Sequence, residues 1–132
     1  MKKRIVFLMC LWAAVTSAMA VEPTCNGGSI ITAKDGTEFC KSDKTMNWWT
    51  AFAWCESQNR KLADFIKMCG NVSQGPSDTE GDCPNLQGVG EGRVWSSVAY
   101  GPASALNVSL SSGAIGGEVS RKYGNGIFAL CE

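Results

Sequence analysis

The chain has 132 residues, equal numbers of basic and acidic residues, seven cysteines and no histidine. Without histidine, serine–histidine and cysteine–histidine catalytic arrangements and the HExxH zinc motif are excluded. The length fits one domain of ordinary size preceded by a short leader.

The first twenty residues have the pattern of a secretory signal peptide. Residues 2–4 are basic, residues 5–15 are apolar, and residues 18–20 read Ala-Met-Ala, a small-residue cleavage site. The apolar run is too short to span a membrane. We therefore expect residues 1–20 to be a signal peptide of bacterial type. Residues 21–132 would then form one exported domain, located outside the cell, on the cell surface or in the periplasm.

The exported part is mildly acidic, with nine lysine and arginine residues against twelve aspartate and glutamate residues. This balance argues against nucleic acid or an anionic membrane as a partner, because both require a basic surface. No later stretch approaches the length of a membrane span, so none is expected in the mature chain.

Six cysteines remain after the leader is removed. An even number in an exported chain of this size predicts a disulfide framework. Six cysteines allow fifteen pairings, among which the spacing alone does not choose. No CxxC pair and no histidine occur, so no zinc site is expected.

The mature chain opens with strand and turn signals. Residues 29–33 have strand composition, residues 34–36 favour a turn, and residues 37–41 read as a returning strand. Such a hairpin would bring Cys25 and Cys40 near each other at its base. Residues 42–45 are expected to form a loop that caps the next element.

Residues 47–59 read as an amphipathic helix. On a helical wheel Ala51, Phe52 and Cys55 fall on the same stripe as Trp48, which predicts a core-facing surface. Trp54 lies about 120° from this stripe. We expect it to pack under a loop or a second element rather than to be an exposed binding residue.

A second, short helix should follow. Asp64 is placed to cap its amino end. Cys69 would be its last residue, and Gly70 would terminate it. Residues 71–93 are rich in glycine, proline, serine, aspartate and asparagine, which predicts a long irregular segment.

Four carboxylates of this irregular segment suggest two hypotheses. They could contribute oxygen ligands to calcium, although their spacing matches no known calcium motif. Two of them could alternatively act as a carboxylate pair in glycoside hydrolysis. A solvated acidic loop is the interpretation we favour. The residues are Asp78, Glu80, Asp82 and Glu91.

The last third of the chain is rich in strand patterns. Residues 94–97 begin it, and residues 106–111 alternate apolar and polar side chains, as in a half-buried strand. Residues 127–131 are almost wholly apolar, which predicts a central strand. The order of hairpin, two helices, long loop and antiparallel meander predicts an α+β fold.

Polar and aromatic residues of this third form the candidate ligand-binding surface. Tyrosine, asparagine, serine and arginine are typical of adaptable recognition surfaces, and equally ordinary on solvent-facing strands and turns. We expect alanine at positions 121 and 123 to weaken binding while leaving thermal stability nearly unchanged. The candidates are Trp95, Tyr100, Asn107, Ser109, Arg121, Lys122, Tyr123 and Asn125.

Two motifs resemble the C-type lectin-like superfamily. Residues 46–65, MNWWTAFAWCESQNRKLADF, resemble its first helix and the entry to its second, and residues 129–132, ALCE, resemble its last strand. Residues 94–97, VWSS, add a weaker likeness. The resemblance implies two helices packed on small antiparallel sheets, with a long irregular loop and stabilising disulfides. It also implies the pairs Cys55–Cys131 and Cys25–Cys40, which leaves Cys69–Cys83.

The chain departs from the sugar-binding members of that superfamily. It has neither the Glu-Pro-Asn or Gln-Pro-Asp tripeptide of the long loop nor the Trp-Asn-Asp before the last strand. Calcium-dependent sugar binding is therefore not implied, and no cofactor is expected. The chain looks more similar to bacterial exported members that bind ligands.

Together these features predict a secreted or cell-surface module that binds a protein or glycan ligand, as an adhesin does, and catalyses no reaction. One alternative is a structural or accessory subunit of a bacterial surface appendage. Another is a small secreted glycoside hydrolase that uses the loop carboxylates.

Overall fold

The computed structural model describes residues 21–70, 82–117 and 119–132. The predicted signal peptide, most of the predicted irregular segment, and the calcium candidates Asp78 and Glu80 lie outside these residues. The described part of residues 82–92 is irregular, as predicted, apart from one short 3-10 helix.

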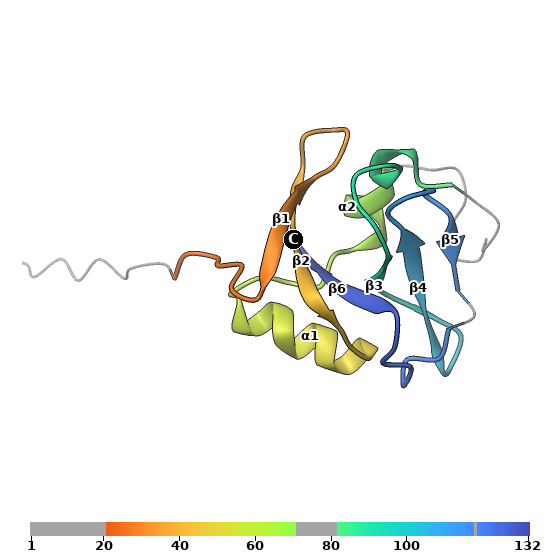
Figure 1. Ribbon diagram of the computed structural model, residues 1–132. Helices are drawn as coiled ribbons and strands as arrows, with labels where there is room; N and C mark the ends of the chain where they lie inside the picture. Colours follow the sequence, from red (N-terminus) through yellow and green to blue (C-terminus); the bar gives the residue numbers. More distant parts are fainter. Residues whose placement is uncertain (1–20, 71–81, 118) are drawn as a thin grey trace, which may run out of the picture.

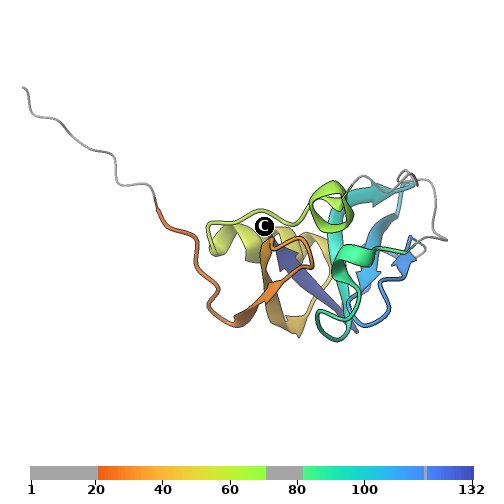
Figure 2. The same cartoon turned by 90° about the horizontal axis from the view of Figure 1, so that it is seen from above.

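Within the described residues, six strands form one mixed sheet in the order β1-β2-β6-β3-β4-β5 (Figure 1). Seen from above, β6 lies between β2 and β3 (Figure 2). Neighbouring strands are antiparallel except β3 and β6, which are parallel. The strands are β1 (Gly28–Thr32), β2 (Glu38–Thr45), β3 (Arg93–Tyr100), β4 (Ser104–Ser109), β5 (Ile115–Gly116) and β6 (Ile127–Cys131).

This sheet confirms the α+β class but corrects two details. The expectation of small antiparallel sheets and a simple meander is wrong, because β6 leaves the meander and returns to the centre of a single sheet. A strand as apolar as β6 needs both faces covered, and the two hydrophobic clusters of the core cover them. Residues 42–45 were expected to be a loop, but they extend β2.

The two helices begin at short polar caps. In α1 (Trp48–Ser57) the Asn47 side chain accepts a hydrogen bond from the Thr50 amide at 2.8 Å. In α2 (Phe65–Cys69) the predicted cap, Asp64, accepts from the Ile66 amide at 2.8 Å. Each cap satisfies an amide that has no partner inside its helix. Gly70 ends α2 with a positive φ of 71°, as expected.

The helices cover opposite faces of the sheet. Ile127, Ala129 and Cys131 of β6 belong to the cluster that packs under α1, whereas Leu130 belongs to the cluster that packs under α2. Alternate residues of a strand point to opposite faces, so the two clusters lie on the two sides of the sheet. In Figure 1, α1 lies along the lower side of the sheet and α2 near its upper side.

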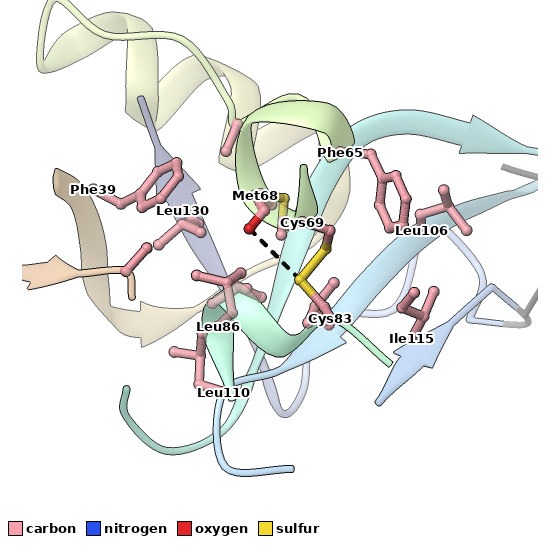
Figure 3. Close-up of a cluster of buried hydrophobic side chains, with 14 residues drawn as sticks. Phe39, Phe65, Met68, Cys69, Cys83, Leu86, Leu106, Leu110, Ile115 and Leu130 are labelled. Atoms are coloured by element: carbon pink, nitrogen blue, oxygen red, sulfur yellow. Dashed lines mark hydrogen bonds between the residues drawn. A yellow bond between two sulfur atoms is a disulfide. The ribbon is translucent and has the colours of Figure 1, made fainter. Parts of the chain in front are cut away.

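The cluster under α2 is the larger one and includes a disulfide (Figure 3). Cys69, at the end of α2, is bonded to Cys83, just before the 3-10 helix η1 (Pro84–Leu86). Leu86 of η1 is fully buried in the same cluster. The disulfide therefore attaches the short 3-10 helix to the core, where its single turn alone would give little stability.

The turn between β1 and β2 is attached to this same layer. Asn85 accepts a hydrogen bond from the Asp35 amide at 2.9 Å and donates one to the Met68 carbonyl at 2.8 Å. The Asp35 carboxylate accepts from the Thr37 amide, which lowers the pKa of that carboxyl. Gly36, with a φ of 89°, completes the turn.

The described residues form three disulfides: Cys25–Cys40, Cys55–Cys131 and Cys69–Cys83. These are the pairs that the resemblance implies. The first holds the segment before β1 to β2, and the second joins α1 to β6. The second encloses 76 residues of sequence separation, whereas the third encloses 14.

Removing these two disulfides separately should have unequal effects. A disulfide lowers the conformational entropy of the unfolded chain by an amount that grows with the logarithm of the loop length. By this effect the Cys55–Cys131 bond should stabilise the fold by about 1.5 kcal/mol more than the Cys69–Cys83 bond. We expect the Cys55→Ala/Cys131→Ala double variant to lose about 4–5 kcal/mol and the Cys69→Ala/Cys83→Ala variant about 3 kcal/mol. Urea unfolding curves give both values, and equal losses would contradict the loop-length explanation.

Candidate ligand-binding surface

Three of the predicted site residues are buried, so the expectation that they face solvent is wrong. Trp95 and Asn107 are fully buried, and Ser109 is nearly so. The Trp95 indole donates to the Met46 carbonyl at 2.8 Å, and Asn107 accepts from the Arg93 guanidinium at 2.8 Å. The alternation in residues 106–111 is misleading, because β4 is covered on both faces.

The other predicted residues lie in two places. Tyr100, at the end of β3, is half-buried against the cluster under α2. Lys122, Tyr123 and Asn125 are exposed on the turn that precedes β6. Arg121, on the same turn, is half-buried. The structure therefore brings four of the eight residues together on one turn and separates Tyr100 from them.

The Arg121 side chain connects this turn to two other parts of the structure. Its guanidinium lies 4.9 Å from the Trp48 ring centroid and 5.9 Å from that of Trp49. It also donates to the carbonyls of Ser104 and Gly101, at 3.1 and 2.9 Å. A planar guanidinium can stack on an aromatic face and donate at its edge at the same time. Arg121 thus joins the start of α1 to the turn between β3 and β4.

Backbone hydrogen bonds fix the same segment from both sides. The Arg121 amide donates to the Ala103 carbonyl at 2.9 Å, and the Arg121 carbonyl accepts from the Trp48 amide at 3.0 Å. The Tyr123 amide donates to the Ser120 carbonyl at 2.9 Å and closes a turn. Exposed residues on this turn are therefore carried by a well-anchored backbone.

Trp49 is the functional candidate that the sequence interpretation missed. Half of its side-chain surface is exposed, whereas Trp48 beside it packs against the core and donates from its indole to the Ser96 carbonyl at 2.8 Å. Consecutive helical residues point about 100° apart. Two adjacent tryptophans therefore could not both lie on the buried stripe, and this was the signal available in the sequence.

We call these four residues the aromatic–arginine surface: Trp48, Trp49, Arg121 and Tyr123. Trp48 is packed edge-on against Trp49, with centroids 5.8 Å apart, and against Phe52 at 4.7 Å. Trp49 and Tyr123 each remain 50% exposed. Large aromatic groups that stay half exposed on a rigid support are typical of recognition sites, because they lose little conformational freedom on binding.

Trp54 does not belong to this surface. It is half-buried against the cluster under α1 and lines a pocket of about 300 Å³ beside the second half of β2. Its packing against a second element confirms the interpretation favoured from the helical wheel.

Two adjoining clefts lie between the second half of α1 and the start of α2. The larger, of about 560 Å³, is lined by three basic and two acidic side chains. The smaller, of about 400 Å³, has an apolar part formed by Phe52 and Leu62. Both clefts include Glu56, Lys61 and Glu132. Their mixed charges favour no single sign of ligand charge.

The described carboxylates give no support to a metal site. Asp82 and Glu91 are exposed, and among residues 21–70, 82–117 and 119–132 no group of three potential metal ligands occurs. The calcium hypothesis, which also involves residues outside those ranges, stays a prediction. In the same part of the chain, no helix has the length and apolar character needed to cross a membrane.

Comparison of the chain with models of known protein families finds no match, and comparison with curated proteins finds none either.

The contacts of Arg121 change the expectation for its replacement. Arg121→Ala should lower the free energy of unfolding by about 1–3 kcal/mol, because hydrogen bonds from a charged group and its stacking are lost together. Arg121→Lys should recover less than half of this loss, since an ammonium cannot replace the planar fork.

Thermal and urea unfolding measure these changes. Lys122→Ala is the matched control, because this neighbouring side chain is exposed, and its effect should stay within about 0.5 kcal/mol. An Arg121→Ala variant as stable as this control would show that the stacked guanidinium contributes nothing to the fold.

Proposed function

We propose that the chain is an exported, non-catalytic ligand-binding module of C-type lectin-like type that recognises a protein or glycan. The observation that carries the proposal is that Trp49 and Tyr123 are both half exposed, and that the Arg121 guanidinium, two residues before Tyr123 in the chain, lies 5.9 Å from the Trp49 ring centroid. Tryptophan, tyrosine and arginine are the residues most enriched at the energetic centres of interfaces.

The arrangement of the surface supports binding rather than a purely structural role. The Arg121 guanidinium is already bonded to two carbonyls, so its main task is to hold the turn in place. The two rings remain available for a ligand, and Lys122 and Asn125 are exposed polar residues on the same turn as Tyr123. An aromatic centre with a polar edge suits both a protein partner and the apolar face of a sugar ring.

The C-type lectin-like assignment is supported by one topological feature. A disulfide joins the first helix to the last strand, Cys55 to Cys131, and that strand pairs with the early strand β2. Three disulfides are compatible with an extracellular or periplasmic location. The proposed ligand binding requires no cofactor.

Replacing Trp49 or Tyr123 by alanine tests the proposal. Each variant should bind its ligand at least about 30-fold more weakly, as expected when an aromatic residue at the centre of an interface is truncated. Each should unfold at nearly the wild-type temperature, because both side chains are half exposed. A glycan array and a pull-down from cell surfaces identify the ligand, and titration then gives the affinities.

Ile66→Ala is the control, since Ile66 is 64% exposed on α2, away from this surface. Ligand binding that survives both aromatic substitutions would move the site elsewhere. Obligate co-purification with appendage subunits, without a saturable ligand, would favour the structural alternative. Turnover of a polysaccharide that is lost in Asp82→Asn or Glu91→Gln would favour the hydrolase.

A further inference from the structure

Two of the disulfides are neighbours in the sheet. Cys40 of β2 and Cys131 of β6 are directly opposite each other in the strand register. Cys40 is bonded to Cys25, and Cys131 is bonded to Cys55. Both residues are fully buried in the cluster under α1, so their side chains lie on the same face of the sheet.

This placement permits a disulfide between Cys40 and Cys131 themselves. Directly opposed residues of antiparallel strands have Cα atoms about 4.5 or about 5.5 Å apart. Both values fall within the range of about 4.4–6.8 Å that a disulfide spans. A bond between Cys40 and Cys131 therefore needs little backbone movement, and it would join two strands that are already paired.

The six disulfide-bonded cysteines differ in their exposure to solvent. Of the six cysteines in the disulfides, five are buried and Cys25 alone is partly exposed. Cys25 is therefore the one of these six cysteines that a thiol from solution can approach most readily. The sulfur that leaves when Cys25 is attacked belongs to Cys40, which faces Cys131.

We propose that Cys25 is a thiol-reactive modification site, and that disulfide exchange proceeds from it to Cys55 by way of the opposed residues Cys40 of β2 and Cys131 of β6. The reactant is a small thiol such as glutathione. Its thiolate attacks the Cys25 sulfur, the Cys25–Cys40 bond breaks with its electron pair going to Cys40, and a mixed disulfide forms on Cys25.

The second step moves the exchange to the helix. The Cys40 thiolate attacks the Cys131 sulfur, the Cys55–Cys131 bond breaks, and the electron pair goes to Cys55, which takes the proton that the small thiol released. The products are a mixed disulfide on Cys25, a Cys40–Cys131 disulfide and a free Cys55 thiol. The β2–β6 pair gains a covalent bond, and α1 loses its bond to β6.

The third disulfide provides an internal control. Cys69–Cys83 lies in the cluster under α2, on the other face of the sheet, and that cluster includes no other cysteine. Reaction at this disulfide has no neighbouring disulfide to which exchange could pass.

Trapping of the wild-type chain tests the proposal. The protein is treated with reduced glutathione near equimolar amounts, quenched with iodoacetamide and mapped as peptides without reduction. We expect glutathione on Cys25, a Cys40–Cys131 linked peptide and an alkylated Cys55. Alkylated Cys40 together with an intact Cys55–Cys131 bond would overturn the proposal.

The Cys25→Ser variant tests the second step alone, because it leaves Cys40 as a thiol from the start. The exchange is supported if most molecules of this variant have a Cys40–Cys131 bond and an alkylatable Cys55. Alkylation of Cys40 alone would overturn it. In the matched Cys69→Ser variant, only Cys83 should be alkylated and both other disulfides should stay intact. If Cys25→Ser does not fold, the wild-type trapping result decides.

Discussion

The central position of β6 is the constraint on which the rest of the fold depends. This strand pairs with β2 on one side and with β3 on the other, although it is the last to be made. Its alternate residues enter the two hydrophobic clusters, so it contributes to both layers of the core. Near its end it also meets the segment before α2, where the Ala63 amide donates to the Leu130 carbonyl at 2.8 Å. The layers that carry α1 and α2 are therefore organised by the same five residues.

Arg121 has a similar joining role for the proposed binding surface. The turn before β6 has to cross from the β4 side of the molecule to the start of α1, and the guanidinium contacts both. The aromatic–arginine surface therefore forms because the chain passes the start of α1 before it enters the central strand β6. This explains why its residues come from two stretches of sequence more than seventy residues apart.

The parts of the fold that depend on local chemistry could be predicted from the sequence. The Asp64 cap, the Gly70 stop, the core-facing Ala51 and the packed Trp54 follow from periodicity and capping preferences. The parallel pairing of β6 with β3 could not, because strand order depends on long-range packing. The burial of Asn107 could not be predicted for the same reason. A polar residue in a period-two pattern is interpreted as facing solvent unless the elements that pack on it are known. For the candidate site, composition pointed to the turn of residues 121–125 but not to Trp49, which meets this turn only through tertiary contact with Arg121.

The disulfides also set how far the domain can stretch under tension. Pulling on the described chain from Val21 and Glu132 transmits force through Cys25–Cys40 and then through Cys55–Cys131. The residues inside each closed loop carry no load while the bonds hold. Only the segment from Cys40 to Cys55, together with the few residues outside the bridges, is free to extend. At roughly 3.5 Å per residue this segment can span at most about 50 Å, whereas a chain without these bonds could span several hundred ångströms. While both bonds hold, the described chain therefore extends far less under tension than it would without them.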